Sequence, residues 1–425
     1  MNIVKTMLNI FSRIFTDTVL IITMYYLCIS FFGLYKKNDK RKIKPEKRFA
    51  LIVAAHNEEA VISGLIHSLN KLDYPKELYD IYVIADNCTD NTAKNAKENG
   101  ALVYERFDKD KRGKGYALEW MFRKIFKMKK KYDSVVIFDA DNLVSKNFLN
   151  EMNKKLVEGY KVVQGYLDSK NPSDSWITGS YSIAFWSTDR MVQLSRSNIG
   201  LSSQLGGTGL CIDIEILKEL GWGATCLTED LEFTCKLVLN GYKVGWAHEA
   251  VVYDEKPLKL VQSWHQRVRW MQGFSDVCSR YFFKLLKRAI TKRSFVALDC
   301  AIYSMQPIIT VLLGVAGILN LIQFSFQASD FIAKVSLSWF FGGVTIFKIF
   351  AILVGVFQYI YTPLVIAMDG KLTFKVIIYY IICYPIYLLT WLPIAIIGMI
   401  NKDKKEWSHT RHTRNVDISD LEKVN

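Results

Sequence analysis

Apolar residues gather in two parts of the chain, with a stretch of ordinary polarity between them. Positions 1–35 and 295–400 are strongly apolar, whereas 45–255 has the charge density of a globular domain. Several apolar runs suit membrane-crossing helices, the first only if it recruits Ile14 and Phe15. These runs are Val19–Tyr35, Val296–Ile322, Val335–Met368 and Phe374–Ile400. The pattern predicts a soluble domain inserted between membrane segments.

Within the middle region, short apolar runs alternate with helical patterns. The runs Phe49–Ala55, Ile81–Ala85 and Val135–Phe138 are almost unbroken, which is typical of parallel strands covered on both faces. Helical periodicity fits the stretches Glu59–Leu69, Thr89–Glu98 and Tyr116–Lys129. This alternation predicts an α/β sheet with its functional groups at the carboxyl ends of the strands.

The charge of the chain indicates how it lies in a membrane. The net charge is +14, and basic residues cluster beside the apolar segments. They are Lys36, Lys37, Lys40, Arg41, Lys42 and Lys44 after the first run, and Lys284, Lys287, Arg288, Lys292 and Arg293 before the second. Because positive flanks stay on the cytoplasmic side, we expect the middle domain in the cytoplasm and no nucleic-acid partner. Eight cysteines without a C-x-x-C pair fit a reducing compartment.

The number of spans stays open. One N-terminal and three later spans would place the C-terminal tail outside, whereas its basic residues predict a cytoplasmic tail. Those residues are Lys402, Lys404, Lys405, Arg411 and Arg414. Pro385 and Pro393 interrupt the last run, which leaves a re-entrant segment as the alternative to a span.

Acidic residues follow two of the predicted strands. Asp86 ends one strand, and Asp139 and Asp141 end another, separated by one alanine. Carboxylates placed in this way can converge on a hard divalent cation, Mg²⁺ or Mn²⁺, that neutralises a diphosphate. The alternatives are a turn or helix cap for Asp86 and a chance triplet for the pair.

Two further motifs carry candidate chemistry. Thr228-Glu229-Asp230 precedes the helical pattern Leu231–Leu239, where the acids either cap the helix or supply Asp230 as a general base. Gln266, Arg269 and Trp270 share one face of a helix, where they suit a diphosphate and a sugar ring. The alternative for this second motif is an amphipathic helix at the membrane surface.

Together, and in this order, the motifs resemble those of the processive membrane members of glycosyltransferase family 2, the cellulose, hyaluronan and poly-N-acetylglucosamine synthases. The resemblance rests on Ala55-His56-Asn57-Glu58, Asp86, Asp139-x-Asp141, Thr228-Glu229-Asp230 and Gln266-x-x-Arg269-Trp270. It runs from about Ala54 to Phe274 and extends into the C-terminal membrane region. Gly206-Gly207-Thr208-Gly209 departs from the cellulose synthase pattern, which argues against a cellulose product.

The resemblance implies a fold and a domain plan. The fold would be an α/β GT-A domain, a Rossmann-like mixed sheet, on the cytoplasmic side and inserted between transmembrane helices. The plan is a membrane anchor at 1–37, the GT-A domain at 45–255, amphipathic helices with the Gln-x-x-Arg-Trp motif at 256–294, a transmembrane region at 295–400 and a basic tail at 401–425.

It also implies roles for single residues. Donor-binding residues would be Ala55, Asn57, Glu58, Asp86, Lys114, Asp139, Gln266 and Arg269, with Asp139 and Asp141 holding Mg²⁺ or Mn²⁺. Asp230 would be the catalytic base, and the acceptor would meet Glu229, Gly207, Thr208 and Trp270. A solvated basic patch is the alternative for Lys114.

The implied reaction is an inverting, processive transfer of a hexose from UDP-glucose or UDP-N-acetylglucosamine to the non-reducing end of a β-linked polysaccharide. Transfer would be coupled to passage of the polymer through a polar-lined route in the plasma membrane, with an export or accessory protein as a further partner. One alternative is transfer of a single sugar to a polyprenyl phosphate. Another is a transporter with a regulatory domain, which predicts paired charges in the spans; Asp299 and Lys348 are the chief candidates.

Overall fold

The structure, a computed structural model, describes residues 2–37, 39, 41–223, 226–318, 346–404, 414 and 416–422. Parts of two predicted spans, at 319–322 and 335–345, lie outside the described residues, as do Lys40, Lys405, Arg411 and the side chain of Lys348. The description below concerns the remainder of the chain.

A mixed sheet of eight strands forms the centre of the domain, in the order β3-β2-β1-β4-β7-β6-β8-β5. The strands are β1 Phe49–Ala55, β2 Tyr79–Asp86, β3 Leu102–Arg106, β4 Ser134–Asp139, β5 Leu143–Val144, β6 Val162–Ser169, β7 Leu210–Asp213 and β8 Val244–Asp254. The three predicted strands are confirmed as β1, β2 and β4, parallel neighbours in the sheet. Ala54 pairs with Asp139 and Ala55 with Ala85, so these strands end side by side and bring their terminal acids to one edge.

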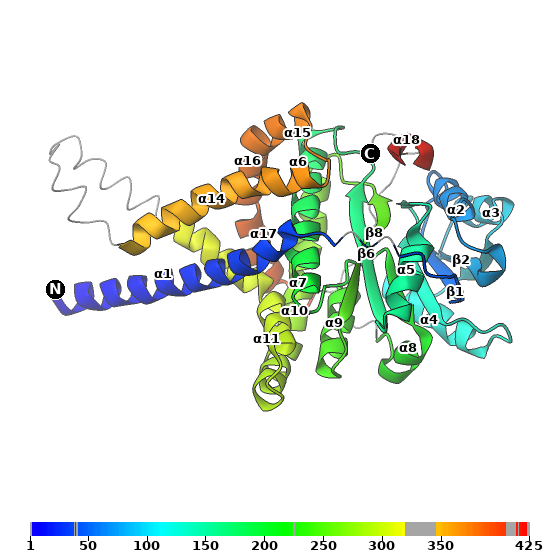
Figure 1. Cartoon of the computed structure of the whole chain (residues 1–425), viewed down its shortest axis with the longest axis horizontal. Coiled ribbons are helices and arrows are strands. Elements are labelled where there is room, and N and C mark those ends of the chain that lie inside the picture. The colour runs from blue at the N-terminus through cyan, green and yellow to red at the C-terminus, as the bar shows by residue number, and fades with distance from the viewer. Residues whose placement is uncertain are drawn as a thin grey trace.

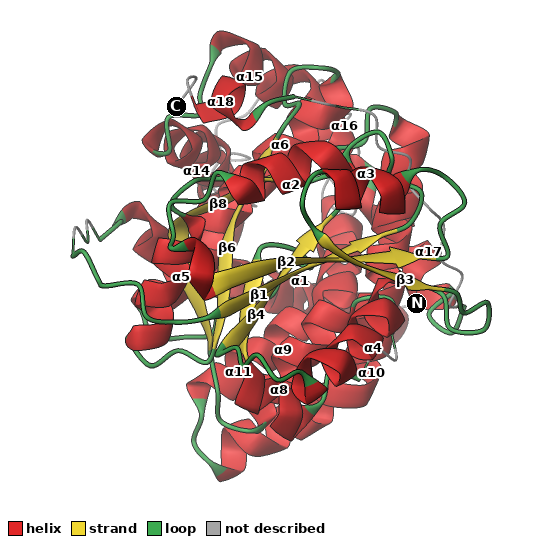
Figure 2. Ribbon diagram, turned by 90° about the vertical axis from the view of Figure 1, so that its right-hand side faces the viewer, coloured by secondary structure: helices red, strands yellow, loops and turns green. Residues whose placement is uncertain are grey.

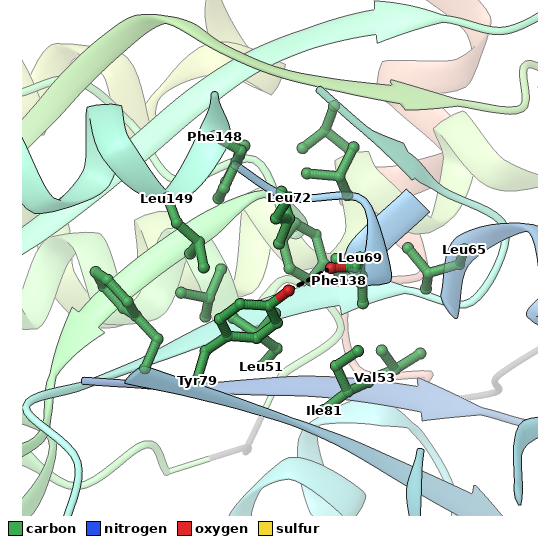
Figure 3. Close-up of a cluster of buried hydrophobic side chains, with 14 of the residues drawn as sticks. Leu51, Val53, Leu65, Leu69, Leu72, Tyr79, Ile81, Phe138, Phe148 and Leu149 are labelled. Carbon is green, nitrogen blue, oxygen red and sulfur yellow. Dashed lines mark hydrogen bonds between the residues drawn. The ribbon is translucent and has the colours of Figure 1, made fainter. Parts of the chain in front are cut away.

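Helices cover both faces of this sheet (Figure 2). One layer is α2 Ile62–Asn70, α3 Thr92–Glu98 and α5 Phe148–Val157, and the other is α4 Lys114–Lys127, α8 Ile214–Leu220 and α9 Glu229–Leu239. Because side chains alternate along a strand, Leu51 and Val53 of β1 face the first layer, while Ala50 and Ile52 face the second. Figure 3 shows the first core, where the Tyr79 hydroxyl donates to the Leu69 carbonyl at 3.0 Å.

Most of the remaining helices lie at the end of the molecule that carries the apolar segments. They are α1 Asn2–Ser30, α6 Trp176–Thr188, α7 Ser195–Asn198, α10 Leu260–Thr291, α11 Phe295–Ser304, α14 Ile346–Met368, α15 Phe374–Ile378, α16 Tyr384–Leu389 and α17 Trp391–Ile400, with a short 3₁₀ turn at Phe31–Leu34 and π-helical turns at Asp189–Leu194 and Tyr379–Cys383. In contrast, α18 Ile418–Glu422 lies beside the sheet domain, and the 3₁₀ turn Lys76–Leu78 leads directly into β2. Figure 1 shows α1 and α14 projecting away from the sheet, whereas α15, α16 and α17 lie across their base.

Two of the predicted spans are confirmed as sufficiently long and apolar. In the described part of the chain these are Asp17–Leu34 and Phe374–Ile400. The described part of the predicted span Val296–Ile322 is apolar and long enough to count as one candidate span, but it is broken, because α11 and the helix Gln306–Ile318 meet at a bend of 63°. Length and composition predict whether a segment is apolar, but not the direction in which it runs.

The last apolar segment passes through Pro385 without turning back, since a π-helical turn precedes this proline and places it in the first turn of α16. Both ends of the segment contact the sheet domain or the helix that follows it. Lys375 Nζ donates to the Ser173 carbonyl at 2.6 Å, and Gln272 Nε2 donates to the Asn401 carbonyl at 3.1 Å. These bonds hold the two ends of the segment against the stretch before α6 and against α10.

The tail also returns to the domain. Arg414 pairs with Asp174 at 2.9 Å, and Ile418 is buried against Leu143 and Tyr253. The described part of the tail therefore packs on the sheet domain, and its predicted cytoplasmic location stays a prediction.

Asp299, one of the charges that a transporter would use, has a structural partner. Its carboxylate pairs with Arg196 at 2.9 Å and accepts a hydrogen bond from the Tyr25 hydroxyl at 2.8 Å, and both charged side chains are buried. The pair joins α1, α7 and α11 where they leave the sheet domain.

Candidate active site

A single cavity of about 2000 Å³ lies at the carboxyl edge of β1, β2 and β4, between the sheet and α10. Every residue predicted for the site lines it. These residues are Ala55, Asn57, Glu58, Asp86, Lys114, Asp139, Asp141, Gly207, Thr208, Glu229, Asp230, Gln266, Arg269 and Trp270. The grouping of the motifs around one pocket, which the sequence predicts, is present in the structure.

The loops that follow β1 and β2 form one rim of the cavity. Asn57 and Asn87 both adopt left-handed backbone angles, with φ of 55° and 52°, a conformation that asparagine tolerates better than most residues. The Thr89 N–H donates to Asn57 Oδ1 at 2.8 Å, and His56 Nδ1 lies 2.7 Å from the Asp86 carbonyl. These bonds join the two loops into one surface that faces the pocket.

Asp86 has a partner that sequence reasoning missed. Arg106, at the end of β3, bonds Asp86 Oδ1 at 2.5 Å, and both side chains are almost fully buried. A buried pair of this kind fixes the direction of the carboxylate. Arg106 could not be found from sequence, because β3 has no apolar run to mark where it ends.

Lys114 joins the strand-end acid to the glycine loop. Its Nζ lies 2.5 Å from Asp139 Oδ1 and donates to the Gly207 carbonyl at 2.7 Å. Burial works to lower the pKa of Lys114, but Asp139, Glu229 and Asp230 outweigh it and hold that pKa above its ordinary value. Lys114 is therefore a fixed cation inside the pocket rather than part of a solvated patch.

Hydrogen bonds to two other side chains hold the loop that carries Asp139 in place. The Asp139 N–H lies 3.1 Å from Asn142 Oδ1 and 3.1 Å from Thr208 Oγ1, and the Thr208 hydroxyl also bonds Asn142. Thr208 is buried and its hydroxyl contacts this loop. These contacts make Thr208 a support of the Asp139 loop, and the acceptor role that the sequence predicts for it stays a prediction. Asn142 is a second support that the sequence did not indicate.

The acidic pair offers hard oxygen ligands to a cation. The Asp139 side chain is 41% exposed toward the cavity, while Asp141 is buried and accepts the Glu255 N–H at 3.1 Å. Among the described residues, no three His, Cys, Asp or Glu side chains lie close enough to hold a metal by themselves. One or two carboxylates, completed by phosphate oxygens and water, are the usual protein contribution to Mg²⁺ binding, so the pair fits this ion with a diphosphate present.

Glu229 and Asp230 begin α9 and face the same space. Asp230 Oδ1 accepts the Leu231 N–H at 2.8 Å, and a Cβ atom built at Gly207 would lie 3.4 Å from Asp230 Oδ2. Burial, and then the charge of Asp230, raise the pKa of Glu229 to about 7, and burial also raises the pKa of Asp230. The site thus holds two carboxylates whose proton affinity lies above the ordinary range.

This pair predicts a pH dependence. A carboxylate base works only when deprotonated, and burial raises the pKa of Asp230, so we expect kcat/KM to fall with decreasing pH at a higher pH than an exposed aspartate would give. Glu229→Gln removes the neighbouring charge, and the acid limb of the pH profile is expected to move to lower pH. The control is Glu215→Gln, a change at an exposed side chain of α8. An acid limb that stays in place in Glu229→Gln would contradict this coupling.

The predicted face of α10 is confirmed. Gln266, Arg269 and Trp270 all line the cavity, and Gln266 Oε1 accepts the Tyr181 hydroxyl at 2.8 Å. The ring of Trp270 lies 6.2 Å from that of Phe185, and these two rings form one wall of the cavity, with the buried ring of Tyr181 packed 6.0 Å from that of Trp270. This wall suits the face of a sugar ring.

Arg267, within the same motif, points the other way. It is fully buried, donates to Thr390 Oγ1 at 2.8 Å, and its guanidinium lies 4.2 Å from the centre of the Tyr387 ring. This contact fixes α10 against α16 and α17 and so orients the face that lines the pocket. The helical period already separates Arg267 from Arg269, but its partners, more than a hundred positions away, could not be predicted.

Gly273 sets the distance between α10 and the acids of α9. A Cβ atom at this position would lie 2.4 Å from Thr228 Oγ1, the residue directly before Glu229. We therefore expect Gly273→Val to displace one of the two helices and to lower kcat/KM by about 10²-fold. Overpacking should also lower stability by about 1–3 kcal/mol. Ser279→Val, at an exposed position of the same helix, is the control; equal kinetics in both variants would contradict this role of Gly273.

Comparison with known proteins agrees with this geometry. A family model described as "Glycosyltransferase like family 2" matches residues 45–273. The chain is 29% identical over 254 residues to the beta-monoglucosyldiacylglycerol synthase of Nostoc sp., with 57% of this chain and 52% of that protein covered. It is 28% identical over 267 residues to the poly-beta-1,6-N-acetyl-D-glucosamine synthase of Staphylococcus aureus, with 61% and 62% covered. The matched part thus spans between half and two thirds of these relatives.

A solved structure shares the fold over nearly the whole chain. The mannosyltransferase PcManGT from Pyrobaculum calidifontis, in complex with GDP-Man and Mn²⁺, is 16% identical with a TM-score of 0.58. The similarity covers 92% of this chain and 97% of that one. The predicted GT-A fold is therefore confirmed. Since the family model covers more than half of the residues, the chain belongs to glycosyltransferase family 2.

Proposed function

We propose that this glycosyltransferase moves a hexose from a UDP-sugar to an acceptor hydroxyl with inversion at the anomeric carbon. The observation that carries the proposal is the convergence of Asp230, Lys114 and Asp139 in one cavity roofed by Arg269 and Trp270. A single displacement needs these parts together: a base for the acceptor and positive charge for the leaving diphosphate.

Each residue has a role in the proposed step. The acceptor oxygen attacks the anomeric carbon and forms the new glycosidic bond, and its proton passes to Asp230. The bond from that carbon to the diphosphate breaks, and the nucleoside diphosphate leaves with the electron pair. Lys114 and Arg269 stabilise the charge that develops on it. An α-linked donor then gives a β-linked product.

A divalent cation fits beside these residues. Asp139 and Asp141 would hold it, and it would supply further positive charge to the diphosphate. The loop of Ala55, Asn57 and Glu58 would hold the uridine, with Asp86 near the base. Gln266 would help to close the donor site, while Glu229, Gly207 and Trp270 would meet the acceptor.

Two acceptors deserve a test. The growing end of a β-linked polysaccharide is favoured by the aromatic wall of Trp270 and Phe185, on which successive sugars can stack, and by the similarity to a poly-N-acetylglucosamine synthase. Under this alternative, transfer is processive and coupled to passage through the membrane. A lipid acceptor is favoured by the similarity to a glucosyldiacylglycerol synthase and by the apolar part of the cavity, described below.

We also propose that the enzyme is anchored in the cell membrane with the sheet domain on the cytoplasmic side. Support comes from the basic residues beside α1 and before α11, and from the apolar segment Asp17–Leu34. The tail, which packs on the sheet domain, would lie on that side as well.

The test is donor use by the purified full chain. Incubation in detergent with radiolabelled UDP-glucose or UDP-N-acetylglucosamine, Mn²⁺ and an extract of membrane lipids and glycans should release UDP and yield a labelled product. Absence of transfer from every UDP-hexose tried, by protein that still binds UDP, would contradict the proposal.

A further inference from the structure

The cavity does not end at the reaction centre. It continues from Asp230 into an arm between three membrane-side elements: α1, the helix Gln306–Ile318, and the α16–α17 segment. Figure 1 shows these elements on the side of the molecule away from the sheet. Whatever occupies this arm is therefore continuous with the acceptor position.

The far part of the arm is apolar. It is lined by Ile22 of α1, Leu313, Gly317 and Ile318 of the bent helix, and Leu392 of α17. Leu313 and Ile318 are each nearly half exposed. Apolar side chains open to a cavity at the membrane end of a protein match a hydrocarbon chain.

Two of the hydroxyls in the arm already donate within their own helices. The Thr23 hydroxyl donates to the Val19 carbonyl at 2.8 Å, and the Thr310 hydroxyl donates to the Gln306 carbonyl at 2.8 Å. A glycan passing these two threonines would leave water without gaining a hydrogen-bond donor from them, which is unfavourable. The polar-lined route that the sequence predicts for a polymer stays a prediction.

We infer that the acceptor is a lipid, whose apolar tail occupies this arm while its nucleophilic oxygen reaches Asp230. This inference rests on the proposed transfer function and names its substrate class. The bonds made and broken are those already given, with the lipid oxygen as nucleophile.

Gly317 provides a probe of the arm. A Cβ atom built there would meet nothing within 4 Å, so a larger side chain can enter the arm without striking the protein. Gly355 of α14 is matched to it, since it is also a helical glycine with open space around it, but it does not line the cavity. The substitutions Gly317→Ala, Gly317→Phe and Gly355→Phe therefore form a graded series with a control.

The experiment offers the purified full chain one radiolabelled UDP-hexose with lipid or soluble acceptors. The lipids are dioleoylglycerol, glucosyl-dioleoylglycerol and undecaprenyl phosphate, which share a long tail and differ in the reacting oxygen. The soluble acceptors are cellotetraose and chitotetraose. We expect label in the organic phase with at least one lipid, and the lipid that accepts it identifies the source.

We expect Gly317→Phe to lower this transfer at least tenfold, Gly317→Ala to lower it less, and Gly355→Phe to match the unsubstituted enzyme. The UDP affinity of each variant shows that the donor site is intact. Label found only in polymer or soluble oligosaccharide would overturn the lipid assignment while leaving the proposed transfer function standing, and so would lipid transfer by Gly317→Phe at the unsubstituted rate. Failure of the transfer function is seen separately, as absence of any product from any donor.

Discussion

Asp230→Asn is expected to lower transfer by about 10²–10⁴-fold, the contribution typical of a positioned general base. The asparagine amide has nearly the shape of the carboxylate and can still accept the Leu231 N–H through its oxygen, but it cannot take a proton from the acceptor. The fold and the affinity for UDP should persist. The measurement is the initial rate of UDP release with acceptor present, together with the dissociation constant of UDP from calorimetry.

The matched control is Asp213→Asn. Asp213 caps α8 by accepting the Glu215 N–H at 2.9 Å, a role that asparagine fills as well, and it does not line the cavity. This variant should keep the rate of the unsubstituted enzyme. Full activity in Asp230→Asn would remove Asp230 as the base and require another residue to take the proton.

Asp139→Asn is expected to abolish the response of the enzyme to divalent cations. A cation at a departing diphosphate contributes several kcal/mol, so its loss should lower the rate by at least about 10²-fold. Chelation with EDTA should inactivate the unsubstituted enzyme to a similar degree, and added Mn²⁺ should restore it but not the variant. Asp139 also bonds Lys114, and in the variant this lysine keeps its bond to the Gly207 carbonyl.

Binding separates this effect from a general loss of structure. Mn²⁺ titration followed by electron paramagnetic resonance, in the presence of UDP, should show one bound ion in the unsubstituted enzyme and in Asp213→Asn, but not in Asp139→Asn. Equal Mn²⁺ binding by Asp139→Asn, with activity that EDTA leaves intact, would contradict a metal site at this pair.

Three of the eight strands could be predicted from sequence, for a physical reason. Strands β1, β2 and β4 are covered on both faces and therefore consist of apolar runs. Strand β6 is buried along its whole length but includes Gln164, whose side-chain oxygen accepts the Gly206 N–H at 2.9 Å and whose amide donates to the Thr208 carbonyl at 2.9 Å. A polar residue that serves a distant loop makes a buried strand look like a surface segment.

The site likewise has residues that could be predicted from sequence and residues that could not. Acids at strand ends and residues at helical spacing can be recognised from neighbouring positions in the sequence. Asp86, Asp139 and Arg269 could therefore be assigned to the site from sequence. The residues that hold these side chains and helices in place could not be recognised from sequence. Arg106 and Arg267 bond partners that come near only in the folded chain. The direction of the apolar segments was hidden for the same reason: the bend after α11 is a property of packing rather than of composition.

The stereochemistry of the product tests the central claim most directly, since a single displacement with Asp230 as base allows only inversion. Proton magnetic resonance of the newly formed glycoside, made by the purified enzyme from an α-linked UDP-hexose, reports the anomeric configuration. We predict a β-linked product at the earliest time point. An α-linked product would show retention and would contradict the assignment of Asp230 as the base of a one-step transfer.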